Sequence, residues 1–241
     1  MSNDITSQLE GAWIPAGTAV AIADSTRVRV GDLPTRVFHW ALVTCVAATV
    51  ASAQQGGNWM AWHTRLGAVI LGLLAFRIVW GLVGPRYARF RSFLYGPRAL
   101  VAHFKSMRSE ADRHAGHSPS GAASVFALLG VLVSLCASGL FSSDSISTDG
   151  PLVRFASEAQ VSLATSVHVT LQWVIYGLVA LHVAAVLAYL VFKKDDLIRP
   201  MINGDKPGIR APGATDSFGV RLGGLTLMLG SVAGAVWLFS A

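Results

Sequence analysis

Five long apolar segments alternate with polar connections along the chain. They cover residues 37–53, 63–83, 122–141, 166–192 and 220–239. A bilayer core about 30 Å thick is crossed by about 20 helical residues, so each segment is close to the length of one span. Backbone N–H and C=O groups inside lipid must be paired within the chain, which favours helices. The pattern therefore predicts an all-α membrane protein with five transmembrane helices, the fifth of them C-terminal.

The polar connections differ in length and character. Residues 84–121 are long and basic, and within them 97–107 predict a short interfacial helix with aromatic and basic side chains suited to lipid headgroups. Residues 200–217 are rich in Pro and Gly, as is typical of an irregular linker. We therefore divide the chain into an N-terminal extension (1–26), a four-helix unit (27–207), and a linker with the fifth helix (208–241).

The distribution of charge gives the predicted helices an orientation. The chain has a mean hydropathy of +0.53 and 13% charged residues, about half the share usual in soluble domains. Fifteen of the 19 Lys and Arg residues lie before the first apolar segment or in the connections after the second and fourth, whereas the other connections carry only Arg154. Basic residues gather on the cytoplasmic side, so we predict a cytoplasmic N-terminus. The net charge of +6 then reflects membrane topology and not nucleic-acid binding.

Four of the seven histidines fall in the predicted spans, where an ionisable side chain costs about 2.5 kcal/mol or more unless it is compensated. They are His39, His63, His168 and His182. Residues 14 apart on a helix share a face and are separated by about 21 Å along its axis, which is the relation between His168 and His182. The predicted depths pair His63 with His168 near the periplasmic side and His39 with His182 near the cytoplasmic side.

Such pairs suit the axial ligands of haem iron, because a neutral imidazole nitrogen on each of two facing helices can clamp one iron. Unrelated polar contacts between helices are the alternative. A zinc, iron–sulfur or covalent c-type haem site is disfavoured because the two cysteines, Cys45 and Cys136, are isolated in apolar runs. Gly67 and Gly177 lie near the histidines and suit either a flat ligand or close helix packing.

Two further groups of residues are candidates for the site. Arg36, Arg65 and Arg77 lie at or within the span ends, where each suits a haem propionate or, equally, a lipid headgroup. The remaining histidines, His103, His114 and His117, lie in the long basic connection and are expected to be solvated.

Six motifs carry a resemblance to a known family. They read VRVGDLPTRVFHW, WHTRLGAVILGLLAFRIVWGLVGPRYARF, GHSPSG, DGPLV, SVHVTLQWVIYGLVALHVAAV and DDLIRPMINGDKP. Over about residues 27–207 the chain resembles the bacterial cytochrome b561, or cytochrome b/b6-domain, proteins, which are related to the b-type cytochrome subunits of nickel–iron hydrogenases and formate dehydrogenases. One departure is Ser118, where the family loop more often reads Gly-His-Asn-Pro.

The resemblance implies a four-helix transmembrane bundle in the bacterial inner membrane that holds two haems b on the four histidines. It implies electron transfer between a quinone pool and a periplasmic cytochrome c, redox enzyme or superoxide, with His117 as a candidate proton donor for quinone. It leaves open whether the chain has quinone reductase activity of its own. The alternatives are a haem-b anchor and relay subunit of a hydrogenase or dehydrogenase, in which the N-terminal extension and fifth helix are docking elements, and a transporter without haem.

Overall fold

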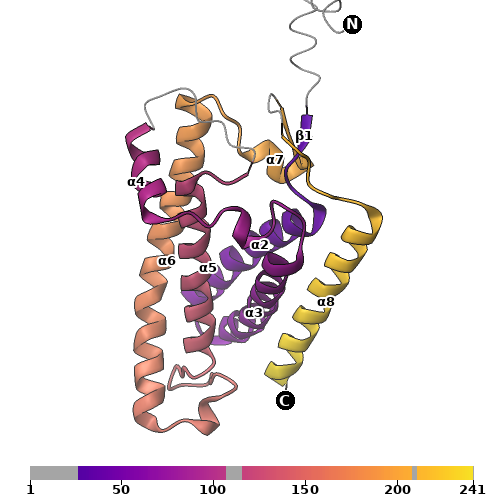
Figure 1. Cartoon of the computed structure of the whole chain (residues 1–241). Helices are drawn as coiled ribbons and strands as arrows, with labels where there is room; N and C mark the ends of the chain where they lie inside the picture. The colour runs from indigo at the N-terminus through magenta and orange to yellow at the C-terminus, as the bar shows by residue number, and fades with distance from the viewer. Residues whose placement is uncertain (1–26, 107–115, 208–210, 241) are drawn as a thin grey trace, which may run out of the picture.

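The computed structural model describes residues 27–106, 116–207 and 211–240 and is dominated by five long helices (Figure 1). All five are long and apolar enough to cross a membrane, which confirms the predicted fold class. They are α2 (Leu33–Gln55), α3 (Met60–Val83), α5 (Pro119–Gly139), α6 (Glu158–Phe192) and α8 (Phe218–Ser240). The N-terminal extension and His114 lie outside the described residues.

Polar caps fix where the long helices begin. The side chain of Asp32 accepts a hydrogen bond from the Thr35 amide at the start of α2, and Ser118 does the same for the Gly121 amide at the start of α5. At α6, Ser157 and Gln160 form a capping box. This box starts α6 eight residues before the predicted apolar segment, so the 35-residue helix is about 52 Å long. It must extend beyond a bilayer core.

Helix α3 is the centre of the bundle: α2 and α8 pack on one part of its surface and α5 on another, and α6 packs mainly on α5. Its residues Phe76 and Leu74 are almost fully buried. The contact with α8 is very close: a Cβ atom added at Gly72 would lie 2.5 Å from Val232 Cα. The fifth helix is therefore an integral part of the bundle along its length.

One end of the molecule carries most of the short elements, and we call it the basic end. It comprises strand β1 (Arg27–Arg29), helix α4 (Pro97–Ser106), helix α7 (Ile198–Asn203) and strand β2 (Asp205–Pro207) (Figure 1). The strands pair antiparallel, with Val28 opposite Lys206. The predicted interfacial helix is present as α4 over the described residues, whereas the two strands were not predicted.

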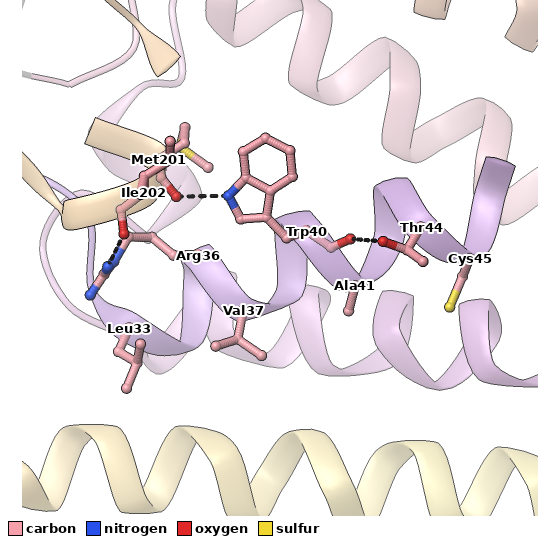
Figure 2. A pocket seen from close by; sticks show the side chains of 9 residues that line it. All are labelled: Leu33, Arg36, Val37, Trp40, Ala41, Thr44, Cys45, Met201 and Ile202. Atoms are coloured by element: carbon pink, nitrogen blue, oxygen red, sulfur yellow. Dashed lines mark hydrogen bonds between the residues drawn. The ribbon is translucent and has the colours of Figure 1, made fainter. Parts of the chain in front are cut away.

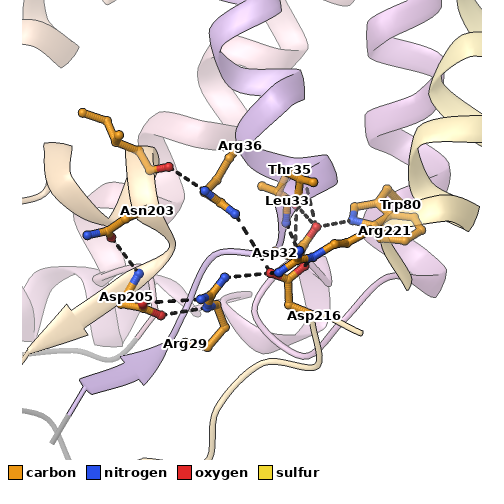
Figure 3. A network of polar contacts seen from close by, with 11 residues as sticks. Arg29, Asp32, Leu33, Thr35, Arg36, Trp80, Asn203, Asp205, Asp216 and Arg221 are labelled. Atoms are coloured by element: carbon orange, nitrogen blue, oxygen red, sulfur yellow. Dashed lines mark hydrogen bonds and ion pairs between the residues drawn. The ribbon is translucent and has the colours of Figure 1, made fainter. Parts of the chain in front are cut away.

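A polar network at the basic end fastens α8 to the start of α2 (Figure 3). The carboxylate of Asp216, just before α8, lies 2.7 Å from Arg29 Nη1 and 2.9 Å from Arg221 Nη2. The same carboxylate accepts a hydrogen bond from the Leu33 amide. Although burial opposes ionisation, the hydrogen bonds from Arg221 and Leu33 hold the pKa of Asp216 below its ordinary value. The ionised carboxylate thus links two segments distant in sequence, residues 29–33 and residues 216–221.

The opposite end of the bundle has shorter connections. Gly56 and Gly57 both adopt positive φ angles, which glycine tolerates without strain, and turn the chain from α2 into α3. Between α5 and α6, Asp144 accepts three backbone N–H bonds, from Ile146, Ser147 and Thr148. These bonds lower the pKa of Asp144 to about 2. The loop is therefore organised around a carboxylate that stays ionised.

Candidate functional site

Towards the opposite end, the structure brings the imidazole rings of His63 on α3 and His168 on α6 close together, in an edge-on arrangement. Their ring centroids lie 6.0 Å apart with an interplanar angle of 79°, and both side chains are half-buried. His63 lies in the first turn of α3, and α6 runs antiparallel to α5 beside it. These are the two histidines that the sequence paired by depth.

Both rings are held by hydrogen bonds at Nδ1. His63 Nδ1 lies 3.1 Å from the Thr49 carbonyl oxygen, and His168 Nδ1 lies 2.9 Å from that of Leu135. Because a carbonyl oxygen only accepts, each Nδ1 carries the proton in these bonds, and Nε2 keeps its lone pair. Gly139 leaves room for the second ring, since a Cβ atom there would lie 3.1 Å from His168 Cε1.

Towards the basic end, His39 on α2 and His182 on α6 are close enough to interact electrostatically. The His182 Nδ1 atom lies 3.4 Å from Ser124 Oγ on α5. The Nδ1 atom of His39 is buried and has no hydrogen-bond partner in the described chain. The His39 ring makes an edge contact with Trp40, with centroids 5.2 Å apart. The second pair is thus held by fewer hydrogen bonds than the first.

The four histidines share a property that suits a ligand: among the described residues, none of their Nε2 atoms takes a hydrogen bond from the protein. Around Gly67 and Gly177, nothing lies within 4 Å of an added Cβ atom. Neither glycine therefore serves close helix packing within the chain, in contrast to Gly72. No cluster of three or more His, Cys, Asp or Glu side chains suited to a bare metal ion occurs in the described ranges.

The three candidate arginines have different surroundings. Arg36 donates to the Ile202 carbonyl at 2.5 Å, while its Nε atom is buried without a partner in the described chain. Arg65 is exposed and lies over the Trp62 ring, 5.3 Å from its centroid. Arg77 is buried, donates to the Ala88 carbonyl at 3.0 Å and lies over the Phe90 ring. Their role as propionate partners stays a prediction.

The expectation that the loop histidines are solvated was wrong for two of them. His103 is 6% exposed and lies 3.1 Å from Ser120 Oγ. His117 packs on Phe93, with ring centroids 4.5 Å apart, and its Nδ1 is buried without a partner in the described chain. Burial, and next the charge of Arg77, lower the pKa of His117 to about 4. Its imidazole is therefore neutral near pH 7 and a poorer proton donor than the sequence suggested.

An open groove of about 540 Å³ runs along one face of α2 (Figure 2). Its wall is mostly apolar, and polar groups gather at the end nearest α7, where Trp40 Nε1 donates to the Met201 carbonyl at 2.9 Å. The lining residues are Leu33, Arg36, Val37, Trp40, Ala41, Thr44, Cys45, Met201 and Ile202. The size lies within the range of small-molecule sites.

Sequence reasoning missed the polar residues on α5 that meet the histidines of α6. Ser124 faces His182 and Ser138 lies 3.3 Å from His168 Nδ1. The signal was present, because the two serines are 14 residues apart, as the two histidines are. Two antiparallel helices with equal spacings bring both pairs into register.

A comparison with protein families gives one match to this chain. The model of the prokaryotic cytochrome b561 family matches residues 30–204, which include all four histidines of the spans. Neither the curated proteins nor the solved structures include a match. Helix α8 and strand β2 lie beyond the matched residues.

Proposed function

Because the chain belongs to the prokaryotic cytochrome b561 family, whose members are helical membrane proteins that bind haem b and transfer electrons, we propose that it carries electrons across the bacterial inner membrane through two haems b. One haem would be held by His63 and His168, the other by His39 and His182. The donor and acceptor would be a quinone pool at the basic end and a redox partner at the opposite end. Family membership sets aside the transporter without haem.

The observation that carries the proposal is the geometry of His63 and His168. Imidazole nitrogens bind metals at about 2.0–2.1 Å, so a metal between two such rings puts the centroids about 6 Å apart, close to the 6.0 Å observed. Both Nδ1 atoms donate to carbonyl oxygens, which leaves Nε2 available as the ligand. For His39 and His182, the support is their matching depth and their proximity, which is close enough for the charge of His182 to act on His39.

The chain's own contribution is to hold and orient the ligands. Haem, when bound, supplies one-electron redox chemistry. The carbonyls of Thr49 and Leu135 fix the tautomer and the orientation of the two imidazoles. Two histidines would hold each iron and would leave no position for oxygen, so the proposal is electron transfer and not oxygen binding. We expect absorption spectra of the native protein that do not change with carbon monoxide.

Substitution of single ligands tests the assignment. His168→Ala should lose one haem and keep the other, and His182→Ala should do the same for the second site. His103→Gln is the matched control, because it alters a buried histidine outside both pairs and should keep two haems. If His168→Ala keeps both haems with unchanged spectra, His168 is not a ligand.

The groove along α2 supports a quinone site at the basic end. It is mostly apolar and carries Arg36 and the Trp40 indole at its polar end. The Trp40 ring in turn contacts the ring of His39, a proposed haem ligand. An isoprenoid quinone combines an apolar tail with a polar ring, which suits this arrangement. We expect Ala41→Trp, which fills the groove, to slow haem reduction by quinol while dithionite reduction stays intact. Ala47→Trp alters an exposed position of α2 outside the groove lining and is the control; equal rates in both variants would remove the groove as the quinone site.

The surface at the opposite end supports docking of a redox partner. Ile146 is 90% exposed and Phe155 is 71% exposed, both on the connection between α5 and α6 near the His63–His168 pair. Exposed apolar side chains are frequent at protein interfaces. An anchor subunit of a larger enzyme would use the same surface. A stoichiometric partner that co-purifies with the chain would favour the anchor role, and a chain that is active alone would count against it.

A further inference from the structure

The antiparallel helices α5 and α6 place one serine against each of two proposed haem ligands. Ser138 Oγ lies 3.3 Å from His168 Nδ1, and Ser124 Oγ lies 3.4 Å from His182 Nδ1. The same side-chain type meets each ring from the same neighbouring helix. The two sites therefore differ in the other hydrogen-bond partners of the Nδ1 atoms, apart from the serines.

At the opposite end, both ligands donate to strong acceptors. The carbonyls of Thr49 and Leu135 lie 3.1 and 2.9 Å from the Nδ1 atoms of His63 and His168. The Ser138 hydroxyl itself donates to backbone carbonyls of its own helix, so its oxygen adds a second, longer acceptor for His168. Each ring of this pair thus has a well-placed partner for its N–H.

At the basic end, both ligands are poorly satisfied. Ser124 Oγ, at 3.4 Å, is the acceptor for His182 Nδ1 in the described chain and lies near the limit of a hydrogen bond. The Nδ1 atom of His39 is buried and takes no bond from the described residues. Both ligands of the site at the basic end are therefore more weakly hydrogen-bonded at Nδ1 than both ligands of the site at the opposite end.

We propose that this asymmetry orders the reduction potentials, with the lower potential at His63 and His168 and the higher at His39 and His182. The proposal rests on the proposed function. A donated Nδ1–H makes an imidazole more basic, which stabilises ferric iron over ferrous iron, and hydrogen bonding around the ligands is one of the means by which proteins set haem potentials. A single electron shared between the sites then resides at the basic end, beside the groove.

The two serines provide a matched test. We would titrate the purified wild-type protein, Ser124→Ala and Ser138→Ala potentiometrically and follow the haem absorption. Two steps are expected in the wild type. Ser124→Ala should raise the higher of the two reduction potentials, because His182 loses its hydrogen-bond acceptor. The expected change is about threefold in the reduction equilibrium constant, or about 30 mV for one electron. Ser138→Ala should move the lower step less, because His168 keeps the Leu135 carbonyl.

Three results would overturn the proposal. They are a shift of the lower step in Ser124→Ala, no shift of either step in that variant, and a single unresolved midpoint in the wild type. The haem content of each sample separates this inference from the proposed function. A protein without haem would refute the proposed function itself, whereas two haems with the potentials in the reverse order would refute only the assignment of the potentials.

Discussion

Replacement of Asp32 by alanine should weaken the basic end of the bundle more than any other single polar substitution there. Asp32 is 1% exposed and lies directly before α2. One of its oxygens, Oδ1, accepts hydrogen bonds from the Thr35 amide and from Trp80 Nε1, both at 3.0 Å (Figure 3). The side chain therefore joins the start of α2 to the end of α3.

The magnitude follows from these bonds. Loss of a helix cap costs about 1 kcal/mol, and a buried indole N–H left without a partner costs about 1–3 kcal/mol. Asp32→Ala should therefore lower the free energy of unfolding by about 2–4 kcal/mol. Asp32→Asn keeps a carbonyl oxygen at the position of Oδ1 and remains a good cap, so it should cost less than about 1 kcal/mol.

Denaturant titration of the purified protein in detergent measures both variants. His39 lies seven residues after Asp32, two turns along the same helix, so we also expect the haem at His39 and His182 to be released first as Asp32→Ala unfolds. The reasoning is refuted if Asp32→Ala is as stable as the wild type. It is also refuted if Asp32→Asn is as damaging as Asp32→Ala, because the contribution would then come from charge and not from hydrogen bonding.

Three further predictions follow from the packing and the ionisable groups. Gly72→Leu should destabilise the protein by about 1–3 kcal/mol or more, because the new side chain would force α8 away from α3. Gly230→Leu is the control, since it alters the open side of α8 and should not destabilise the protein. Thermal unfolding in detergent compares the two variants, and equal effects would contradict the close contact at Gly72. The pKa of His117 is lowered from 6.5 to about 4 in the folded protein. The neutral imidazole therefore contributes its full share to the free energy of unfolding above pH 6.5. That contribution is lost as the pH falls towards 4, by about 3 kcal/mol in total at about 1.4 kcal/mol per pH unit. His117→Gln should remove that part of the pH dependence of unfolding, and an unchanged profile would show that the imidazole is not buried in its neutral form. Asp216→Asn should loosen the attachment of α8 and increase protease cleavage between α7 and α8, because it removes the carboxylate that pairs with Arg29, Arg36 and Arg221. Unaltered cleavage would contradict the role of the network.

The sequence predicted the spans and the pairing of histidines by depth because both depend on features that are local in the sequence. Apolar length marks a membrane helix wherever it occurs, and equal depth follows from counting residues along helices of known direction. The start of α6 was missed by eight residues because the apolar run begins inside the helix. The Ser157 and Gln160 capping box marks the true start and is visible in the sequence.

Other features depend on contacts between distant segments, which periodicity does not reveal. Strands β1 and β2 lie on either side of the family match and pair with each other across its whole length. With three residues each, neither has a strand pattern of its own. The low pKa of His117 depends on its burial, to which the contact with Phe93 contributes, and on the charge of Arg77 near the end of α3. A basic, polar sequence around a histidine therefore did not predict its neutral environment.

The haem content of the purified protein tests the central claim most directly. A pyridine haemochrome assay, combined with a reduced-minus-oxidised difference spectrum and a protein determination, gives the number and type of haems per chain. We predict two haems b in each chain. A purified, folded protein without haem would contradict it, and one haem per chain would show that one of the two histidine pairs does not hold iron.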